Sequence, residues 1–306
     1  MEAKGTGKPL EELTLLDRFL FAEAMEVPEN MQILLEIILG RDIVLKFPPQ
    51  TEREERRSPL SRFVRLDVWA RDEEDTVYDT EVQKANAKNL PKRSRYYQGM
   101  IDSQLLEPGE VDFNRLSPVF IIVIAPFDLF GRGLYRYAFC NSCREVPGLE
   151  LEDEAVRIFL NTHGTSEEGA DRELVELLQY MEHTNRAGQE FNSDRLKRLQ
   201  ASVRSIQHNA EVGVRYMQEW EERILEQQAA QREGWTKGRA EGKAEGIALS
   251  VLELLGELGE VPSEWKDRIS AEKDPDVLRA WLKKAARAES IAQFTEGADA
   301  CLLPRG

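Results

Sequence analysis

The sequence has few cysteines, few histidines and no long apolar stretch, and each shortage excludes a class of protein. Its 306 residues include 3 cysteines, Cys140, Cys143 and Cys301, which cannot form the disulfide framework of a small secreted domain. The longest apolar run, residues 119–125, is far too short to span a bilayer, and no leader with a basic start and an apolar middle opens the chain. We therefore expect a cytoplasmic protein with no membrane partner.

The chain also lacks an excess of basic residues. With 41 lysines and arginines against 56 aspartates and glutamates, its formal net charge is −15. A chain this acidic does not coat nucleic acid along its whole surface, so any contact to phosphate groups has to be local. The 3 histidines lie far apart in the sequence with no nucleophile motif beside them, and this leaves a Ser-His-Asp triad without support.

The most informative stretch is residues 64–83, VRLDVWARDEEDTVYDTEVQ. On either side of an acidic turn, successive side chains alternate between two faces of a predicted strand. This pattern predicts a β-hairpin. If the turn is centred near Glu73 and Glu74, Asp67 and Glu81 lie at equal distances from it and face each other across the ladder. Two such carboxylates can supply hard oxygen ligands to Mg²⁺. From the spacing alone, an exposed polar face on an ordinary hairpin is favoured, because acidic residues are common on solvated strand faces.

Helices and short strands are predicted on both sides of this hairpin. Apolar residues at helical spacing predict two helices after Thr14, interrupted at Pro28 and ended by Gly40. Residues 48–59 are expected to form a charged loop. Strands are predicted over residues 43–47, 117–125 and 134–140, with an edge strand over 155–160. From residue 167 the composition is helical, with a short helix over 174–181 and one long charged helix over 195–228.

A basic run follows the hairpin. Residues 84–95 contain no acid, and their basic residues are Lys84, Lys88, Lys92, Arg93 and Arg95. An amphipathic helix is predicted to start near Pro91, and it places Arg93 and Tyr97 on one face because they are four residues apart. A basic helix start beside a metal-binding hairpin would hold a phosphodiester, whereas runs of lysine are also common on solvated helix faces.

Three further features have more than one explanation. Cys140 and Cys143 form a CxxC, but a structural zinc site needs two more ligands and His163 is the only nearby candidate, so two incidental thiols are favoured. Asp17 begins the first helix, where a carboxylate is favourable to the helix dipole. Near the C-terminus, glycine recurs every fourth residue from Gly234 to Gly246, at a cost of roughly 1 kcal/mol each against alanine in a helix. This repeat is either a helix face that a partner helix approaches closely, as in a dimer, or a flexible connector.

Several of these segments occur in an order that resembles a known family. RLDVWARDEEDTVYDTEVQ, NLPKRSRYYQGMID, VFIIVIAPFDLFGRGLYRYAF and FLNTHG together resemble the PD-(D/E)XK nuclease family transposases, also called recombination-promoting nucleases, from Leu16 to the glycine repeat. The resemblance implies an α/β fold with a restriction-endonuclease-like core, in which helices flank a central mixed sheet, and an α-helical C-terminal region. The implied segments are a nuclease-like core over 1–165, a helical extension over 166–230 and a glycine-spaced tail over 231–306 for oligomerisation or interaction.

The resemblance also implies a metal-dependent DNA endonuclease that is associated with recombination or mobile elements. Asp67 and Glu81 would bind Mg²⁺, with Mn²⁺ as a substitute, and Gln83 stands where the superfamily signature has a lysine. A glutamine can orient a water or a phosphate through hydrogen bonds, but it has no positive charge to stabilise an anion. Lys84 follows at once, yet it points to the opposite face of the strand.

On the same basis, a set of helix residues would bind the DNA backbone, and one acid would be accessory to the site. These residues are Lys88, Lys92, Arg93, Arg95 and Tyr97, with Tyr96 as the alternative to Tyr97, and Asp17. The implied partners are DNA and a second copy of the chain, bound through the C-terminal helices. Gln83 and the acidic net charge favour an alternative, a nuclease-fold scaffold of weak or no activity that binds DNA or self-associates. The retained pair of Asp67 and Glu81 favours catalysis.

Overall fold

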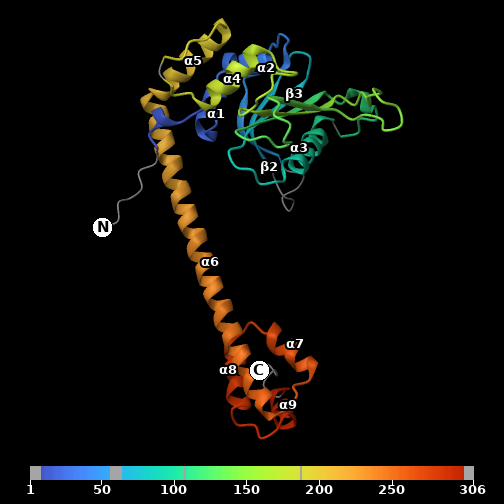
Figure 1. Cartoon of the computed structure of the whole chain (residues 1–306), viewed down its shortest axis with the longest axis vertical. Coiled ribbons are helices and arrows are strands. Elements are labelled where there is room, and N and C mark those ends of the chain that lie inside the picture. Colours follow the sequence, from blue (N-terminus) through green and yellow to red (C-terminus); the bar gives the residue numbers. More distant parts are fainter. Residues whose placement is uncertain (1–7, 56–63, 107, 187, 300–306) are drawn as a thin grey trace. The chain divides into compact units, whose positions relative to one another are not determined.

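The chain folds into two compact units, Met1–Gln218 and Glu219–Gly306. The first contains a six-stranded sheet with helices around it, and the second is helical (Figure 1). The computed structural model describes residues 8–55, 64–106, 108–186 and 188–299.

The sheet is mixed, with the strand order β1-β2-β3-β4-β6-β5. Its strands are β1 (Gln50–Glu55), β2 (Val64–Arg71), β3 (Val77–Val82), β4 (Val119–Ala125), β5 (Arg136–Phe139) and β6 (Ala155–Asn161). Strand β4 pairs in parallel with β3 and with β6, and the other neighbouring pairs are antiparallel. Both the hairpin of β2 and β3 and the central mixed sheet of a restriction-endonuclease-like fold are as predicted.

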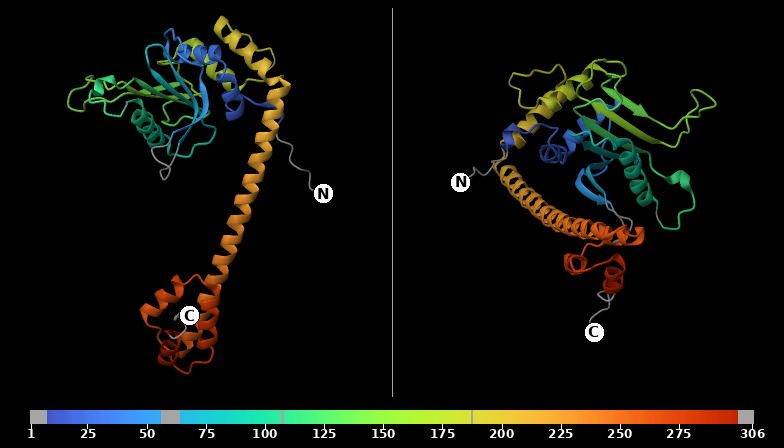
Figure 2. Two further views of the ribbon diagram at one scale, coloured as in Figure 1. Left: turned by 180° about the vertical axis from the view of Figure 1, so that it is seen from behind. Right: turned by 60° about the horizontal axis from the view of Figure 1, so that its bottom comes forward.

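Helices cover both faces of this sheet, as Figure 2 shows. On one face, Ile122 and Ile124 belong to the same buried cluster as residues of α1 (Arg18–Met25), α2 (Pro28–Leu39), α4 (Arg172–Glu182) and α5 (Asp194–Gln207). On the other face, Ile121 and Val123 are buried with residues of α3 (Leu90–Leu105). Because successive residues of β4 point to opposite faces, its continuous apolar run serves both layers at once.

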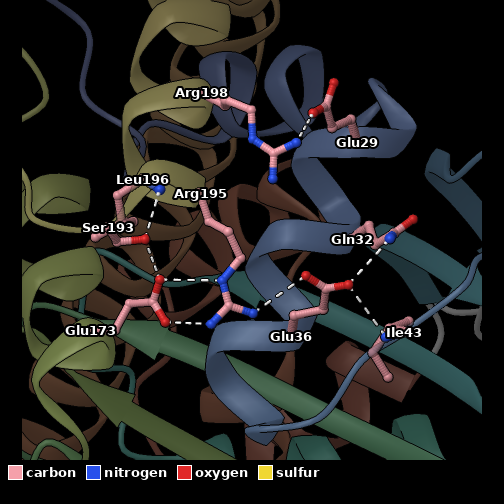
Figure 3. A network of polar contacts seen from close by, with 9 residues as sticks. All are labelled: Glu29, Gln32, Glu36, Ile43, Glu173, Ser193, Arg195, Leu196 and Arg198. Carbon is pink, nitrogen blue, oxygen red and sulfur yellow. Dashed lines mark hydrogen bonds and ion pairs between the residues drawn. The ribbon is translucent and has the colours of Figure 1, made fainter.

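An ion-pair network holds α4 and α5 to α2, and Figure 3 shows it from close by. Arg195 of α5 donates from Nε to Glu173 Oε1 of α4 at 3.2 Å and from Nη1 to Glu36 Oε2 of α2 at 3.4 Å. Glu36 Oε1 in turn accepts from the backbone N–H of Ile43 at 3.4 Å. At the edge of the network, Arg198 pairs with Glu29 at 2.9 Å. Helices α4 and α5, which follow the sheet in sequence, are therefore part of the first unit.

Four predicted elements were wrong in detail. The loop predicted over 48–59 contains β1, an edge strand whose polar sequence has no apolar alternation, and residues 56–59 lie outside the described residues. The strand predicted over 43–47 contributes only an isolated bridge between Leu45 and Asp72. Strand β6 is interior, because β5 returns antiparallel beside it and takes the edge. The long helix predicted over 195–228 is interrupted after α5, because Asn209 accepts hydrogen bonds from the N–H groups of Glu211 and Val212 and begins a new helix.

The new helix is α6 (Ala210–Leu258), which starts in the first unit and continues in the second. It contains the glycine repeat as regular helix, and among the described residues no heavy atom outside the helix lies within 4 Å of a Cβ built on Gly238 or Gly242. The second unit also contains α7 (Ser263–Ala271), α8 (Pro275–Ala285) and α9 (Ile291–Asp299), with Trp265, Trp281 and Phe294 in its core. In the described ranges, no helix combines the length and apolar character that crossing a membrane requires.

Candidate active site

Asp67 on β2 and Glu81 on β3 lie opposite each other in the hairpin. The pairing of Val68 with Thr80 sets this register, and the next residues along the ladder are the two acids. The backbone N–H of Asp67 donates to Glu81 Oε1 at 3.1 Å, and the N–H of Val82 donates to Asp67 Oδ2 at 3.3 Å. The residues are only 5% and 2% exposed, respectively. The hairpin backbone thus holds two buried carboxylates side by side.

An arginine from each flanking helix layer pairs with one of these acids. Arg18, the first residue of α1, places its Nε 2.7 Å from Asp67 Oδ1. Arg93, in the first turns of α3, forms an ion pair with Glu81 Oε2 and donates from Nη1 to Gln83 Oε1 at 2.8 Å. The two positive charges balance the two buried negative charges, which would otherwise be costly to desolvate.

Burial controls how readily the acids ionise. It raises the pKa of Glu81 to about 7, and the charge of Asp67 adds to this rise while Arg93 opposes it. Burial also raises the pKa of Asp67, against the opposing effect of Arg18. Because a carboxylate has to be ionised to bind a cation, metal binding at this pair is expected to release protons near neutral pH.

The acids lie in a hollow of about 630 Å³. Its lining has four basic and two acidic side chains, so this part of an acidic protein is locally positive. The residues that line it are Arg18, Arg65, Asp67, Glu81, Val82, Gln83, Asn89, Lys92, Arg93, Tyr96 and Tyr97. Such a hollow offers a local site for a phosphate group, which is the kind of contact that the net charge allows.

The structure brings together some of the residues proposed from the sequence and separates others. Seven of them line the hollow: Asp67, Glu81, Gln83, Lys92, Arg93, Tyr96 and Tyr97. Arg95 lines a second hollow that adjoins the first along α3. Lys88 is exposed in the turn before α3, with a left-handed φ of 56°, and lines neither hollow.

Asp17 lies outside the hollow and has partners of its own. Its Oδ2 accepts from the backbone N–H of Thr14 at 2.8 Å, and its Oδ1 pairs with Lys84. Lys84 is thereby directed away from the acid pair, as the alternation along β3 predicts. Asp17 thus stabilises the turn that enters α1, and the neighbouring Arg18 is the residue that reaches the acids.

Sequence reasoning missed Arg18, Arg65 and Asn89 as lining residues. The sequence does indicate Arg65, because it is two residues before Asp67 on β2 and therefore points to the same face of the strand. Asn89 is the N-cap position of α3 and follows directly from where that helix begins. Arg18 has no local signal, since only the packing of α1 on the sheet brings it to a strand far along the chain.

The donor groups in the hollow suit a hard divalent cation. Mg²⁺ is commonly held by one or two carboxylates and keeps its other positions for water and substrate phosphate, and Asp67 and Glu81 supply such a pair. Val82 also lines the hollow. No group of three or more histidine, cysteine or acidic side chains arranged to hold a metal occurs within the described residues. Cys140 and Cys143 are free thiols in the loop between β5 and β6.

Comparison with protein-family models identifies a family for this chain. A family model described as PD-(D/E)XK nuclease family transposase matches residues 19–232 of the chain. The match covers every lining residue of the hollow except Arg18, which is one position before it, and ends at Arg232, just before the glycine repeat. No curated protein and no solved structure matches the chain.

Proposed function

Because the chain belongs to the PD-(D/E)XK nuclease family transposases, we propose that it is a cytoplasmic, Mg²⁺-dependent DNA endonuclease that acts in recombination or in the movement of mobile elements. The observation that carries this proposal is the buried pair of Asp67 and Glu81, which face each other in a locally positive hollow. A surface hairpin with no function has no reason to bury two carboxylates beside each other, because their desolvation costs stability.

In this proposal Asp67, Glu81 and the carbonyl of Val82 hold Mg²⁺, or Mn²⁺ in its place. When bound, the cation lowers the pKa of a water and polarises the scissile phosphate. The chain's own residues bind and orient the DNA strand. Lys92 and Arg65, which line the same hollow, are placed to bind phosphate oxygens on either side of the one that is cut.

Arg93 is the residue that supplies the positive charge missing at Gln83. Gln83 Nε2 donates to the carbonyl of Ala85 at 2.8 Å, which fixes the side-chain amide so that its Oε1 faces Arg93. Gln83 therefore positions the guanidinium, and the guanidinium lies beside Glu81, where a lysine of the family signature would place its ammonium. A guanidinium presents two parallel N–H donors to a phosphate and suits a developing negative charge.

Plasmid cleavage tests the proposal. Purified protein is incubated with supercoiled plasmid and Mg²⁺, Mn²⁺ or EDTA, alongside Asp67→Asn, Glu81→Gln and the matched control Glu74→Gln, an exposed acid in the turn of the same hairpin. We expect cutting that requires the cation, is lost in both site variants and is kept in the control. Arg93→Lys should keep a fraction of the activity and Arg93→Met almost none.

Gln83 in place of lysine favours a second candidate, a nuclease-fold scaffold that binds DNA or self-associates through its C-terminal helices. In that case the folded wild type binds labelled DNA but leaves the plasmid intact with either cation. Sedimentation of the full chain at increasing concentration tests the self-association. The exposed glycine face of α6 provides the surface on which a second copy could lie.

A further inference from the structure

A second hollow, of about 380 Å³, adjoins the candidate active site along α3. On this face of α3, Lys92, Arg95, Tyr96 and Gly99 are exposed. The residues that line the second hollow are Lys92, Arg95, Tyr96, Gly99 and Met100. Lys92 and Tyr96 also line the first hollow, so Tyr96 stands at the boundary between the two.

The two adjacent tyrosines of α3 are placed differently. Tyr97 is half-buried, and the guanidinium of Arg93 lies 5.2 Å from the centre of its ring. Tyr96 is 44% exposed. An exposed aromatic ring on a basic helix is costly to leave in water and gains most from a flat apolar partner.

The surface next to Tyr96 leaves space for such a partner. Gly99, three residues further along the helix, has no side chain, and no heavy atom of the described part of the chain outside the helix lies within 4 Å of where its Cβ would be. Met100, which is 3% exposed, contributes an apolar surface to the same hollow. The ring is therefore flanked by open, partly apolar space of the kind that accepts a planar group.

Two cations flank this space. Lys92 and Arg95 lie on α3 within one turn of Tyr96, and both line the second hollow. An aromatic ring between cationic side chains is the arrangement with which proteins bind single-stranded nucleic acid, because the ring stacks on a base while the cations bind the phosphates around it. Stacking on a base also contributes to the binding affinity without depending on charge, so the net charge of −15 does not weaken this contribution.

We propose that Tyr96 stacks on an unpaired base beside the scissile phosphate, so that the site prefers single-stranded DNA, or the single-stranded part of a junction or end, over continuous duplex. This inference rests on the proposed function, and it names the substrate class of that site. In a continuous duplex the bases stack on one another and are closed to a side chain outside, so only an unpaired base gains from Tyr96.

Binding in EDTA tests the inference without cleavage. Fluorescence anisotropy is measured with one labelled strand of mixed sequence, alone and annealed to its complement, for the wild type, Tyr96→Ala, Tyr96→Phe and the control Phe113→Ala, another exposed ring outside both hollows. We expect the wild type to bind the single strand more tightly than the duplex. Tyr96→Ala should weaken single-strand binding roughly 5- to 150-fold, and it should change duplex binding less than twofold.

Further comparisons distinguish stacking from a structural role of Tyr96. Tyr96→Phe, which keeps the ring, and Phe113→Ala should both bind the single strand as the wild type does. A strand that carries 2-aminopurine, an adenine analogue whose fluorescence falls on stacking, should be quenched by the wild type and by Tyr96→Phe but not by Tyr96→Ala. Circular dichroism establishes that each variant is folded before its affinity is compared.

Several outcomes would overturn the inference. These are equal affinity of the wild type for the single strand and the duplex, equal losses on both in Tyr96→Ala, or tighter binding of the same sequence as RNA. The test is independent of catalysis. If Tyr96-dependent binding is found in a protein that, with Mg²⁺ or Mn²⁺, cuts neither the plasmid nor the labelled single strand, the proposed endonuclease fails and the stacking site stands. If the protein cuts DNA but its binding does not depend on Tyr96, the endonuclease stands and the stacking site fails.

Discussion

The buried carboxylate pair should make the metal-free protein lose stability as pH rises towards 8. Glu81 has an ordinary pKa of 4.5, and in the folded protein its pKa is about 7. Between these values the folded state keeps a proton that the unfolded state has released, so the free energy of unfolding falls with increasing pH and levels off above pH 7. At about 1.4 kcal/mol for each pKa unit, the full loss is on the order of 3 kcal/mol.

About 2 kcal/mol of this loss falls between pH 5.5 and pH 8, where an unfolding experiment can measure it. For a unit of this size it corresponds to a fall of roughly 4–8 °C in melting temperature. The variant Glu81→Gln has no proton to exchange at this position. It loses its ion pair with Arg93 at every pH, so the comparison is between the pH slopes of the two proteins and not between their stabilities at one pH.

The assay is thermal or urea unfolding of the full chain in EDTA at pH 5.5, 7 and 8, with Glu74→Gln as the control. We expect Glu81→Gln to lose about 2 kcal/mol less than the wild type over this range, and the control to follow the wild type. Groups that titrate elsewhere in the protein affect all three proteins alike and cancel. Mg²⁺ added at pH 8 should restore stability to the wild type but not to Glu81→Gln, because binding to the folded state alone is stabilising. Parallel pH profiles for wild type and Glu81→Gln would refute the reasoning.

The remaining predictions concern packing. Gly164→Ala should lower the free energy of unfolding by about 1–3 kcal/mol, because its Cβ would come within 2.4 Å of the Tyr135 ring; urea titration measures this, and an unchanged midpoint would contradict it. Trp281→Ala should cost the second unit about 3–5 kcal/mol while the first keeps its unfolding transition, which scanning calorimetry can follow; loss of both transitions together would argue against two separate units. The double variant G238A/G242A should stabilise α6 by roughly 2 kcal/mol, seen as a higher melting temperature by circular dichroism, unless close approach of a partner helix requires the glycines.

The acid pair was predictable from the sequence because a hairpin sets its own register. Alternation along each strand decides which side chains share a face, and the distance of each residue from the turn decides which ones meet. Asp67 and Glu81 satisfy both conditions. The start of α3 was also predictable from the local sequence, because Pro91 is well tolerated in a first helical turn and occupies that position in the structure.

The missed features depend on packing between distant segments. Arg18 reaches Asp67 because α1 lies against the sheet, and no periodicity within α1 encodes that contact. The sequence of β1 predicts a loop and not a strand, because an edge strand with one neighbour needs no apolar alternation. The order of β6 and β5 in the sheet depends on the strand beside which the chain returns. The sequence pattern of neither strand indicates this neighbour.

The core of the first unit is completed late in the chain. Val203 and Val212 are buried in the same cluster as the helices before the sheet, and the ring of Tyr216 lies 5.0 Å from that of Phe19. On a ribosome, Tyr216 is added about 120 residues after Tyr97, which takes on the order of ten seconds at typical rates of translation. A nascent chain therefore carries every side chain of the hollow well before it can hold them in place. The candidate site is therefore complete only after the last residues of the first unit have been synthesised.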